Sequence, residues 1–245
     1  MKQPDPKAEM EKAWRLMTAP FRVLPSFVIA GAPKCGTTTL ADCIAAHPRV
    51  RRGARKEPTS LLHYPGSRLR TAMHYPLRWG GRFMAGDGSV EYFTHPEGPR
   101  NVREVLPEAR LIFLLRDPVK RAWSDYQMFC KHGDEREPFG GRVRKAMLWL
   151  RDPEMQSLVD AASREAFNPV RYVQAGLYAR MLERWFAEFP REQCLVLPSE
   201  EFFSDRPLAM ARVFAHLGLD PVEADSIPKQ RPRPMAMSEY PEKSK

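Results

Sequence analysis

The sequence contains no hydrophobic run of about 18 residues, the length that a membrane-spanning helix needs. Its first twenty residues also lack the apolar core of a secretory signal peptide. These two absences predict no integral membrane segment and no N-terminal anchor, and they favour a cytoplasmic protein. No internal repeat and no low-complexity tract is present either, so the chain is expected to fold as an ordinary globular protein.

Cysteine is scarce, and its spacing indicates no site. The four cysteines form no CxxC pair, and no group of Cys and His residues has the spacing of a zinc site. Free thiols and no metal are therefore expected. Basic residues are plentiful, with a formal net charge of +9, but they are scattered and are not interleaved with aromatic residues as in a nucleic-acid-binding module. The charge therefore predicts an anionic ligand and no nucleic acid.

The most informative stretch is Ser26–Leu40, which reads SFVIAGAPKCGTTTL. Its first part, Phe27–Ala30, is apolar and suits a short buried strand. Glycines then force a tight loop, and a helix is expected to begin at the threonines and to end before Pro48. A strand, a glycine-bearing loop and a helix N-terminus make a binding site for a phosphate-like anion. The candidate binding residues are Lys34, Cys35, Gly36, Thr37, Thr38 and Thr39.

This loop differs from the standard loop that binds nucleoside triphosphates. The standard loop ends in Gly-Lys-Ser/Thr, whereas Lys34 precedes Gly36 by two positions here. In addition, no predicted strand ends in an acidic residue suited to holding magnesium. A tight turn whose threonines only cap a helix remains the alternative interpretation.

Predicted strands alternate with predicted helices along the chain. The strands are expected at Phe27–Ala30, Gly86–Phe93, Arg110–Leu115 and Cys194–Leu197, and the helices include Lys7–Met17, Pro96–Leu106, Pro118–His132, Leu177–Phe189 and Pro207–Leu217. This order predicts a single α/β domain over residues 1–245, with a central parallel sheet flanked by helices on both faces. Residues 1–25 are expected to form a helical lead-in, and the Pro-rich residues 221–245 a disordered or truncated tail.

A second motif follows the predicted strand Arg110–Leu115. Arg116 comes directly after the strand, and Asp117-Pro118 is a strong helix start. Ser124 stands eight residues after Arg116, about two turns along that helix. A guanidinium and a hydroxyl so placed suit one phosphate group, unless Arg116 pairs with a carboxylate and Ser124 lies on the surface. The apolar stripe of the helix is expected at Val119, Ala122, Trp123, Tyr126 and Phe129 or Cys130.

Together the two motifs resemble those of sulfotransferases that use PAPS (3′-phosphoadenosine-5′-phosphosulfate). Gly31–Leu40 is similar to the 5′-phosphosulfate-binding loop, and Leu114–Tyr126 to the 3′-phosphate-binding segment, of bacterial and heparan-sulfate-type carbohydrate sulfotransferases. The resemblance covers most of residues 27–217 and implies a P-loop-like domain. It implies transfer of a sulfuryl group from PAPS to a hydroxyl or amine of a carbohydrate, lipid or natural-product acceptor, an activity of the EC 2.8.2 type that leaves PAP (3′,5′-adenosine diphosphate). No metal is implied, since the protein's own cations replace magnesium.

The same resemblance assigns roles to single residues. Glu57, in Lys56-Glu57-Pro58, stands where the heparan-sulfate group carries its catalytic base, with His63 as a second candidate. Lys34 is expected to stabilise the charge on the departing phosphate, while Arg116 and Ser124 hold the 3′-phosphate. The structural alternative for Glu57 is a salt bridge to one of its basic neighbours.

Departures from the family pattern concern the acceptor. Thr59 and Leu62 replace the His and Asp that follow the catalytic Glu in glucosamine-modifying members, and Gly88 replaces a Lys. Heparan sulfate itself is therefore not the expected acceptor. The walls of the acceptor pocket are expected in residues 61–81 and 131–166. Two other functions stay open, a nucleotide kinase or other NTPase and an inactive nucleotide-binding partner protein. The oligomeric state is not predicted.

Overall fold

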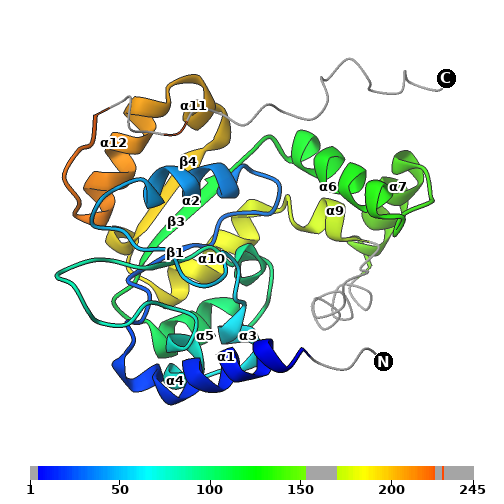
Figure 1. The fold of residues 1–245 in the computed structure, drawn as a ribbon. Coiled ribbons are helices and arrows are strands. Elements are labelled where there is room, and N and C mark those ends of the chain that lie inside the picture. Colours follow the sequence, from blue (N-terminus) through cyan, green and yellow to red (C-terminus); the bar gives the residue numbers. More distant parts are fainter. Residues whose placement is uncertain (1–4, 153–169, 224–227, 229–245) are drawn as a thin grey trace.

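The computed structural model describes residues 5–152, 170–223 and 228 of the 245. Its centre is a four-stranded parallel sheet with the strand order β2-β1-β3-β4. The strands are β1 (Phe27–Ile29), β2 (Gly86–Asp87), β3 (Arg110–Leu115) and β4 (Cys194–Pro198). Because β1 lies between β2 and β3, the loop that follows β1 leaves the middle of the sheet (Figure 1).

Helices cover both faces of this sheet (Figure 1). They are α1 (Pro6–Met17), α2 (Thr37–Ala45), α3 (Ser60–His63), α4 (Arg68–Ala72), α5 (Gly98–Val105), α6 (Pro118–His132), α7 (Phe139–Trp149), α9 (Arg171–Gln174), α10 (Tyr178–Glu188), α11 (Ser199–Ser204) and α12 (Arg206–Leu217), with 3₁₀ helices η1 (Ala19–Phe21), η2 (Val90–Phe93) and η4 (Arg191–Gln193). On one face α2 packs with α12, and on the other α5 packs with α10. The predicted α/β fold is thereby confirmed.

The core is built around β3, whose central residues are fully buried. Phe113 packs edge-on against Trp185 of α10, with 5.4 Å between ring centroids, and Phe93 lies 5.9 Å from Phe113 on the same face. On the opposite face Leu40 of α2 and Phe214 of α12 are also buried. Burial of each such side chain contributes about 1.5–3 kcal/mol to folding. The core therefore holds the ends of β1 and β3, where both predicted phosphate motifs begin.

The predicted strand at residues 86–93 is wrong in its length. β2 contains only Gly86 and Asp87, and the chain then turns into η2. The carboxylate of Asp87 accepts a hydrogen bond from the backbone N–H of Ser89 at 2.9 Å. An aspartate that bonds the backbone two residues ahead stabilises a turn rather than an extended strand.

The apolar stripe predicted for α6 is also partly wrong. Val119 is exposed, whereas the side chains buried by this helix are Arg121, Ala122 and Asp125. The structure thus buries an ion pair where the periodicity predicted hydrophobic residues. α6 packs against α9, which in turn packs against α7, and the three helices form an arm beside the sheet (Figure 1).

The other predicted strands and helices agree closely with the structure where it describes the chain. The helices predicted at Lys7–Met17, Pro118–His132 and Pro207–Leu217 correspond to α1, α6 and α12. Within the described ranges, no helix is both long enough and apolar enough to cross a membrane. Most of the predicted tail at residues 221–245 lies outside the described residues.

Candidate phosphate and sulfuryl-transfer site

The loop between β1 and α2 has the backbone of a binding turn. Gly36 has a φ of 95°, and a Cβ there would lie 2.6 Å from the ring of Phe203, so only glycine fits. Lys34 also has a positive φ, 68°, which is uncommon for a residue with a side chain. Strained backbone of this kind concentrates at functional sites. No side chain among the described residues caps the start of α2, so its first backbone N–H groups can face an anion.

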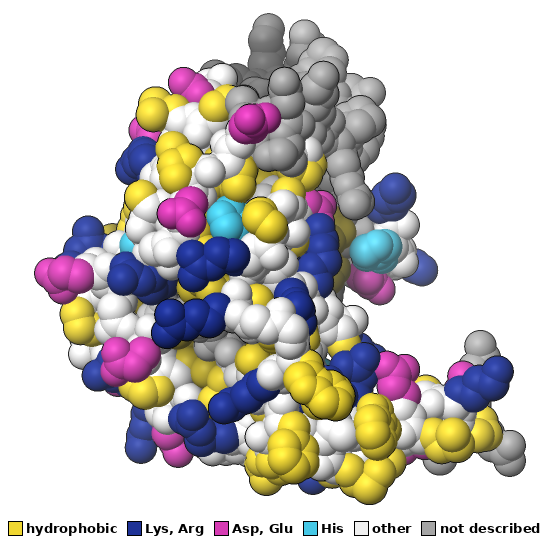
Figure 2. All heavy atoms as spheres, turned by 60° about the vertical axis from the view of Figure 1, so that its left-hand side comes forward, with side chains coloured by type: hydrophobic (Ala, Val, Ile, Leu, Met, Phe, Trp, Pro, Cys, Tyr) yellow, Lys and Arg dark blue, Asp and Glu magenta, His cyan; other side chains and the backbone are white. Residues whose placement is uncertain are grey.

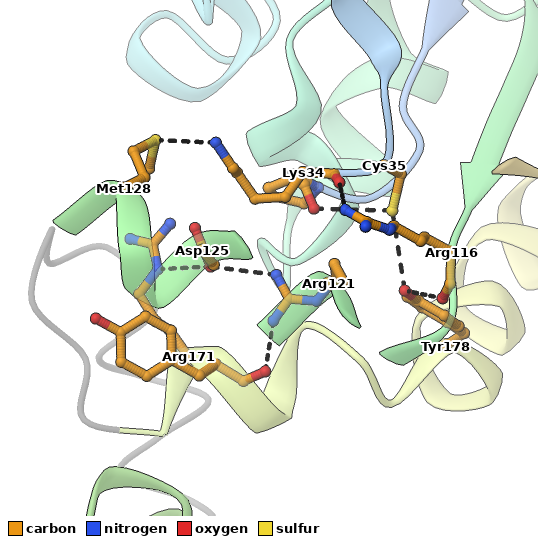
Figure 3. Close-up of polar contacts among 10 residues, drawn as sticks. Lys34, Cys35, Arg116, Arg121, Asp125, Met128, Arg171 and Tyr178 are labelled. Atoms are coloured by element: carbon orange, nitrogen blue, oxygen red, sulfur yellow. Dashed lines mark hydrogen bonds and ion pairs between the residues drawn. The ribbon is translucent and has the colours of Figure 1, made fainter. Parts of the chain in front are cut away.

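Lys34 lies in a cationic environment. Its Nζ is 3.4 Å from the Sδ of Met128 on α6 (Figure 3). Burial lowers the pKa of Lys34; Asp125 counteracts this effect, while Arg116 and Arg121 lower the pKa further. An anionic ligand bound beside these cations would offset their mutual repulsion and favour the charged form of Lys34. The predicted loop and the inner face of α6 therefore lie next to each other.

Cys35 is buried, and its side chain lies beside the hydroxyl of Tyr178. Burial raises the pKa of its thiol to about 11, so the thiol stays neutral near pH 7. The hydroxyl of Ser199, at the start of α11, donates a hydrogen bond of 2.7 Å to the carbonyl oxygen of Cys35. Cys35 is thus a small filler of the turn, and Ser199 is a supporting residue that the sequence motifs did not reveal.

The second predicted motif lies next to the loop. Arg116 follows β3, and its Nη1 lies 3.5 Å from the carbonyl oxygen of Lys34. The hydroxyl of Tyr178, the first residue of α10, donates to the carbonyl oxygen of Arg116 at 2.7 Å and lies 3.9 Å from the Sγ of Cys35 (Figure 3). Ser124 is half-buried on α6. Its contact with a phosphate stays a prediction.

Beneath the site lies an ion pair that the sequence did not predict. Arg121 and Asp125 are both fully buried, and Nη1 of Arg121 lies 3.1 Å from Oδ2 of Asp125. Arg121 also donates to the carbonyl oxygen of Tyr172, and Arg171 lies 3.5 Å from the same carboxylate oxygen (Figure 3). In the sequence, the i,i+4 spacing of Arg121 and Asp125 indicates an ion pair within one helix. Such pairs usually lie on the helix surface, so the spacing alone does not predict burial.

Of the threonines predicted to bind the anion, Thr37 is buried, Thr38 is exposed and Thr39 is half-buried. All three belong to the first turn of α2. Their placement at the helix N-terminus agrees with the predicted strand, loop and helix arrangement, while their contacts with a ligand stay a prediction.

Glu57 is exposed and forms an ion pair with Lys56. In the part of the chain that the structure describes, it makes no hydrogen bond or ion pair with Lys34 or Arg116. The structural alternative considered for Glu57 is therefore present, although an exposed pair of this kind contributes little to stability. His63, the second candidate for a base, is exposed at the end of α3.

The side chain of Lys56 lies over Gly88. A Cβ on Gly88 would be 3.3 Å from the Cγ of Lys56 and 3.6 Å from its Cε. A cavity of about 260 Å³ lies next to this pair, between β1, α2 and residues 50–56. The side chain over Gly88 is thus that of a cationic residue from the neighbouring segment.

Basic residues are concentrated rather than scattered, contrary to the expectation from the sequence. Residues 49–82 hold nine Lys and Arg residues against one acidic residue, Glu57, which gives a net charge of +8 of the chain's +9. Figure 2 shows Lys and Arg side chains gathered across the middle of one face, with few acidic ones among them. Arg55 is exposed and makes no hydrogen bond or ion pair within the described ranges. We find no group of three or more potential metal-ligating side chains in the described residues.

Comparison with curated proteins identifies carbohydrate-modifying relatives. The chain is 30% identical over 252 residues to carbohydrate sulfotransferase 15 of Rattus norvegicus, a match that covers 82% of this chain and 45% of that protein. It is 29% identical over 212 residues to heparan sulfate glucosamine 3-O-sulfotransferase 6 of Homo sapiens, with 83% of this chain and 55% of that protein covered. The chain therefore spans about half the length of the curated relatives it matches.

These relatives contradict the predicted cytoplasmic location, because carbohydrate and heparan sulfate sulfotransferases are Golgi-type enzymes. The prediction depended on the lack of a long apolar run. Such a lack carries no information about compartment in a chain that spans about half of its relatives.

Solved structures show the same fold. A sulfotransferase from Alicyclobacillus acidocaldarius superposes with a TM-score of 0.64 at 25% identity, over 86% of this chain and 87% of that one. The sulfotransferase domain from the curacin biosynthetic pathway gives a TM-score of 0.51 at 12% identity, over 84% and 77% of the two chains. Residues 24–231 match the family described as the sulfotransferase domain, so they include both phosphate motifs and the whole sheet. The chain belongs to the sulfotransferase domain family.

Proposed function

We propose that the protein transfers a sulfuryl group from PAPS to a hydroxyl of an acidic glycan. The observation that carries the proposal is the meeting of Lys34 and Arg116 at the N-terminus of α2, with 3.5 Å between Arg116 Nη1 and Lys34 O. Two cations and a helix N-terminus suit a donor with phosphate groups at both ends. In this assignment Lys34 and the first turn of α2 bind the 5′-phosphosulfate, and Arg116 and Ser124 bind the 3′-phosphate.

The reaction needs a base, a stabilised leaving group and a fixed donor. Glu57 takes the proton of the acceptor hydroxyl as its oxygen attacks sulfur. A new O–S bond forms, the bond between sulfur and the bridging phosphate oxygen breaks, and the electron pair stays on the 5′-phosphate of PAP. Lys34 stabilises the charge that develops there, and Arg116 keeps the donor in line for attack.

The acidic glycan is proposed from charge and from the relatives. The segment before Glu57 is basic, and the net charge of +8 in residues 49–82 suits a polymer with carboxylate or sulfate groups. The curated relatives carry carbohydrate and heparan sulfate in their names. One predicted acceptor wall, residues 131–166, lies partly outside the described residues.

Donor binding is tested by thermal shift with PAP. Binding to the folded state alone raises the melting temperature, and PAP should do so with or without magnesium. ATP should act more weakly because it lacks the 3′-phosphate. A preference for ATP that disappears on adding a chelator would contradict the proposal and favour a kinase or NTPase.

The roles of Glu57 and Lys34 are separated by two variants. Glu57→Gln should leave PAP affinity nearly unchanged and lower turnover by roughly 10²–10⁴-fold, the usual contribution of a general base. Lys34→Ala should lower both, because its charge serves the bound donor and the transition state. Unchanged turnover of Glu57→Gln would exclude it as the base, and intact PAP binding without turnover in the wild type would favour an inactive binding protein.

A further inference from the structure

The turn that follows β2 holds the backbone on both sides of Glu57. The N–H of Gly88 donates to the carbonyl oxygen of Lys56 at 3.0 Å. The N–H of Thr59 donates to the hydroxyl oxygen of Ser89, also at 3.0 Å. Glu57 and Pro58 thus lie between two backbone positions, Lys56 and Thr59, that are hydrogen-bonded to the adjacent residues Gly88 and Ser89.

Asp87 organises this turn with both oxygens of its carboxylate. One oxygen accepts from the N–H of Ser89 at 2.9 Å, and the other accepts from the hydroxyl of Tyr92 at 3.0 Å. The oxygen of Tyr92 in turn accepts from the N–H of Leu61 in α3 at 3.3 Å. The network therefore begins at Asp87, at the end of β2. Through Ser89 and Tyr92 it reaches the backbone of Thr59 and Leu61, just after Glu57.

Every side chain of the network is inaccessible to solvent. Asp87, Ser89 and Tyr92 are each 0% exposed. Burial raises the pKa of Asp87, although the hydrogen bonds from Ser89 and Tyr92 oppose the effect. A buried carboxylate is unfavourable unless its partners are well placed, and such networks specify one geometry of the surrounding chain.

The segment needs this support because its own conformation is unfavourable. Thr59 has a φ of 50°, in the left-handed region that a branched side chain rarely adopts. Glu57 itself is exposed, and its ion pair with Lys56 joins two flexible side chains. The buried network, together with the bond from the Gly88 N–H to the Lys56 carbonyl oxygen, therefore helps to fix where the Glu57 side chain starts and in which direction it leaves the backbone.

We propose that Asp87, Ser89 and Tyr92 are positioning residues for Glu57, with the hydroxyl of Ser89 as the direct link. The inference rests on the proposed function, in which Glu57 is the general base. A base must lie within hydrogen-bond reach of the acceptor proton, and a shift of about 1 Å can cost 10²-fold in rate. A network fixed to β2 ties that distance to the sheet that also carries the phosphate loop.

The test is Ser89→Ala, which deletes the acceptor of the Thr59 N–H. Turnover should fall about tenfold to a hundredfold, with PAP affinity unchanged. Ser60→Ala is the matched control, because Ser60 is the same residue type, 1% exposed, and its hydroxyl has no hydrogen-bond partner within the described residues. Tyr92→Phe, which keeps the ring and removes the hydroxyl, should act like Ser89→Ala and serves if the latter does not fold.

A double variant distinguishes positioning from general stability. If Ser89 acts through Glu57, then Ser89→Ala combined with Glu57→Gln should turn over no more slowly than Glu57→Gln alone. The inference would be overturned if the double variant turned over more slowly than Glu57→Gln, by the product of the two single losses. Wild-type turnover in both Ser89→Ala and Tyr92→Phe would also overturn it. Either result would leave Glu57 as the base. Unchanged turnover of Glu57→Gln would overturn the base assignment and this inference with it.

Discussion

Two neighbouring residues of the loop between β1 and α2, Lys34 and Cys35, direct their side chains into different environments. Lys34 directs its ammonium group towards α6, whereas Cys35 points into the core beside Tyr178. The left-handed backbone at Lys34 and the positive φ of Gly36 produce this alternation. Single residues of the motif therefore differ in what their loss should do.

Replacing Arg116 with Ala should weaken PAP binding by about 1.5–3 kcal/mol, the range for hydrogen bonds to charged groups. Lys should restore only part of the loss, because an ammonium cannot present the planar fork of a guanidinium. Isothermal titration with PAP measures both. Arg110→Ala is the control, since Arg110 is exposed at the other end of β3. Equal affinity of Arg116→Ala and wild type would show that the 3′-phosphate is bound elsewhere.

The buried thiol of Cys35 should make the fold less stable in alkali. Its pKa is about 9 in the unfolded chain and about 11 in the fold. The stability linked to this group is complete below pH 9 and is lost as the pH rises towards 11, because only the unfolded state releases the proton in that window. Up to about 2.7 kcal/mol is involved, at 1.36 kcal/mol for each of the two pKa units between the unfolded and folded values.

Urea unfolding between pH 8 and 10.5 measures this loss. Cys35→Ala should show a shallower fall of the unfolding free energy with pH, and Cys130→Ala, which changes an exposed cysteine, should keep the wild-type slope. Identical slopes in all three proteins would mean that the thiol does not resist ionisation.

At the scale of an element, α6 combines a proposed ligand-binding face with a buried ion pair. Its N-terminus is capped by Asp117, whose carboxylate accepts from the N–H of Lys120 at 2.8 Å, as the Asp-Pro start predicted. One turn further on, Arg121 and Asp125 face the core instead of solvent. This pair orients the face of the helix that approaches Lys34.

Asp125→Ala should destabilise the protein by about 3–5 kcal/mol, because Arg121 would be left buried without its carboxylate. Glu97→Ala breaks the exposed pair with Arg100 and should change stability by no more than about 0.5 kcal/mol. Denaturant unfolding of the two variants compares them directly. A similar small change in both would show that the buried pair is dispensable.

For the whole molecule, charge is distributed unevenly. Residues 49–82 carry most of the excess positive charge and include both Glu57 and the segment that lines the cavity. The remainder of the chain is nearly neutral by comparison. A polyanionic acceptor would therefore be drawn to the side of the protein where the proposed base lies.

Salt should weaken the apparent affinity for an acidic glycan, because screening acts over about 8–10 Å at physiological ionic strength. Arg55→Glu should raise the KM for that acceptor about tenfold and reduce the salt dependence, while Arg110→Glu makes the same charge change at the exposed N-terminal end of β3. Initial rates with a sulfated or uronic-acid glycan and with a neutral one, at several salt concentrations, measure this. Equal KM values for the two variants would contradict an electrostatic acceptor site.

The order of strands and helices, the phosphate loop and the start of α6 could be predicted from the sequence, because each depends on local features. Apolar runs such as Arg110–Leu115 form strands, glycines form turns, and Asp117-Pro118 starts a helix whatever surrounds them. Both phosphate motifs and the family followed from these segments. The C-terminal edge of the sheet then brought Lys34 and Arg116 together.

Only the tertiary structure decided which polar residues are buried and which segments support the site. The burial of Arg121 with Asp125 and the bond from Ser199 to the loop depend on partners far away in the sequence or on neighbouring elements. Periodicity measures hydrophobicity and not pairing, so it assigned α6 an apolar stripe and residues 86–93 a strand. The environment of Glu57 arises in the same way, since its anchors Gly88 and Ser89 lie about thirty residues away.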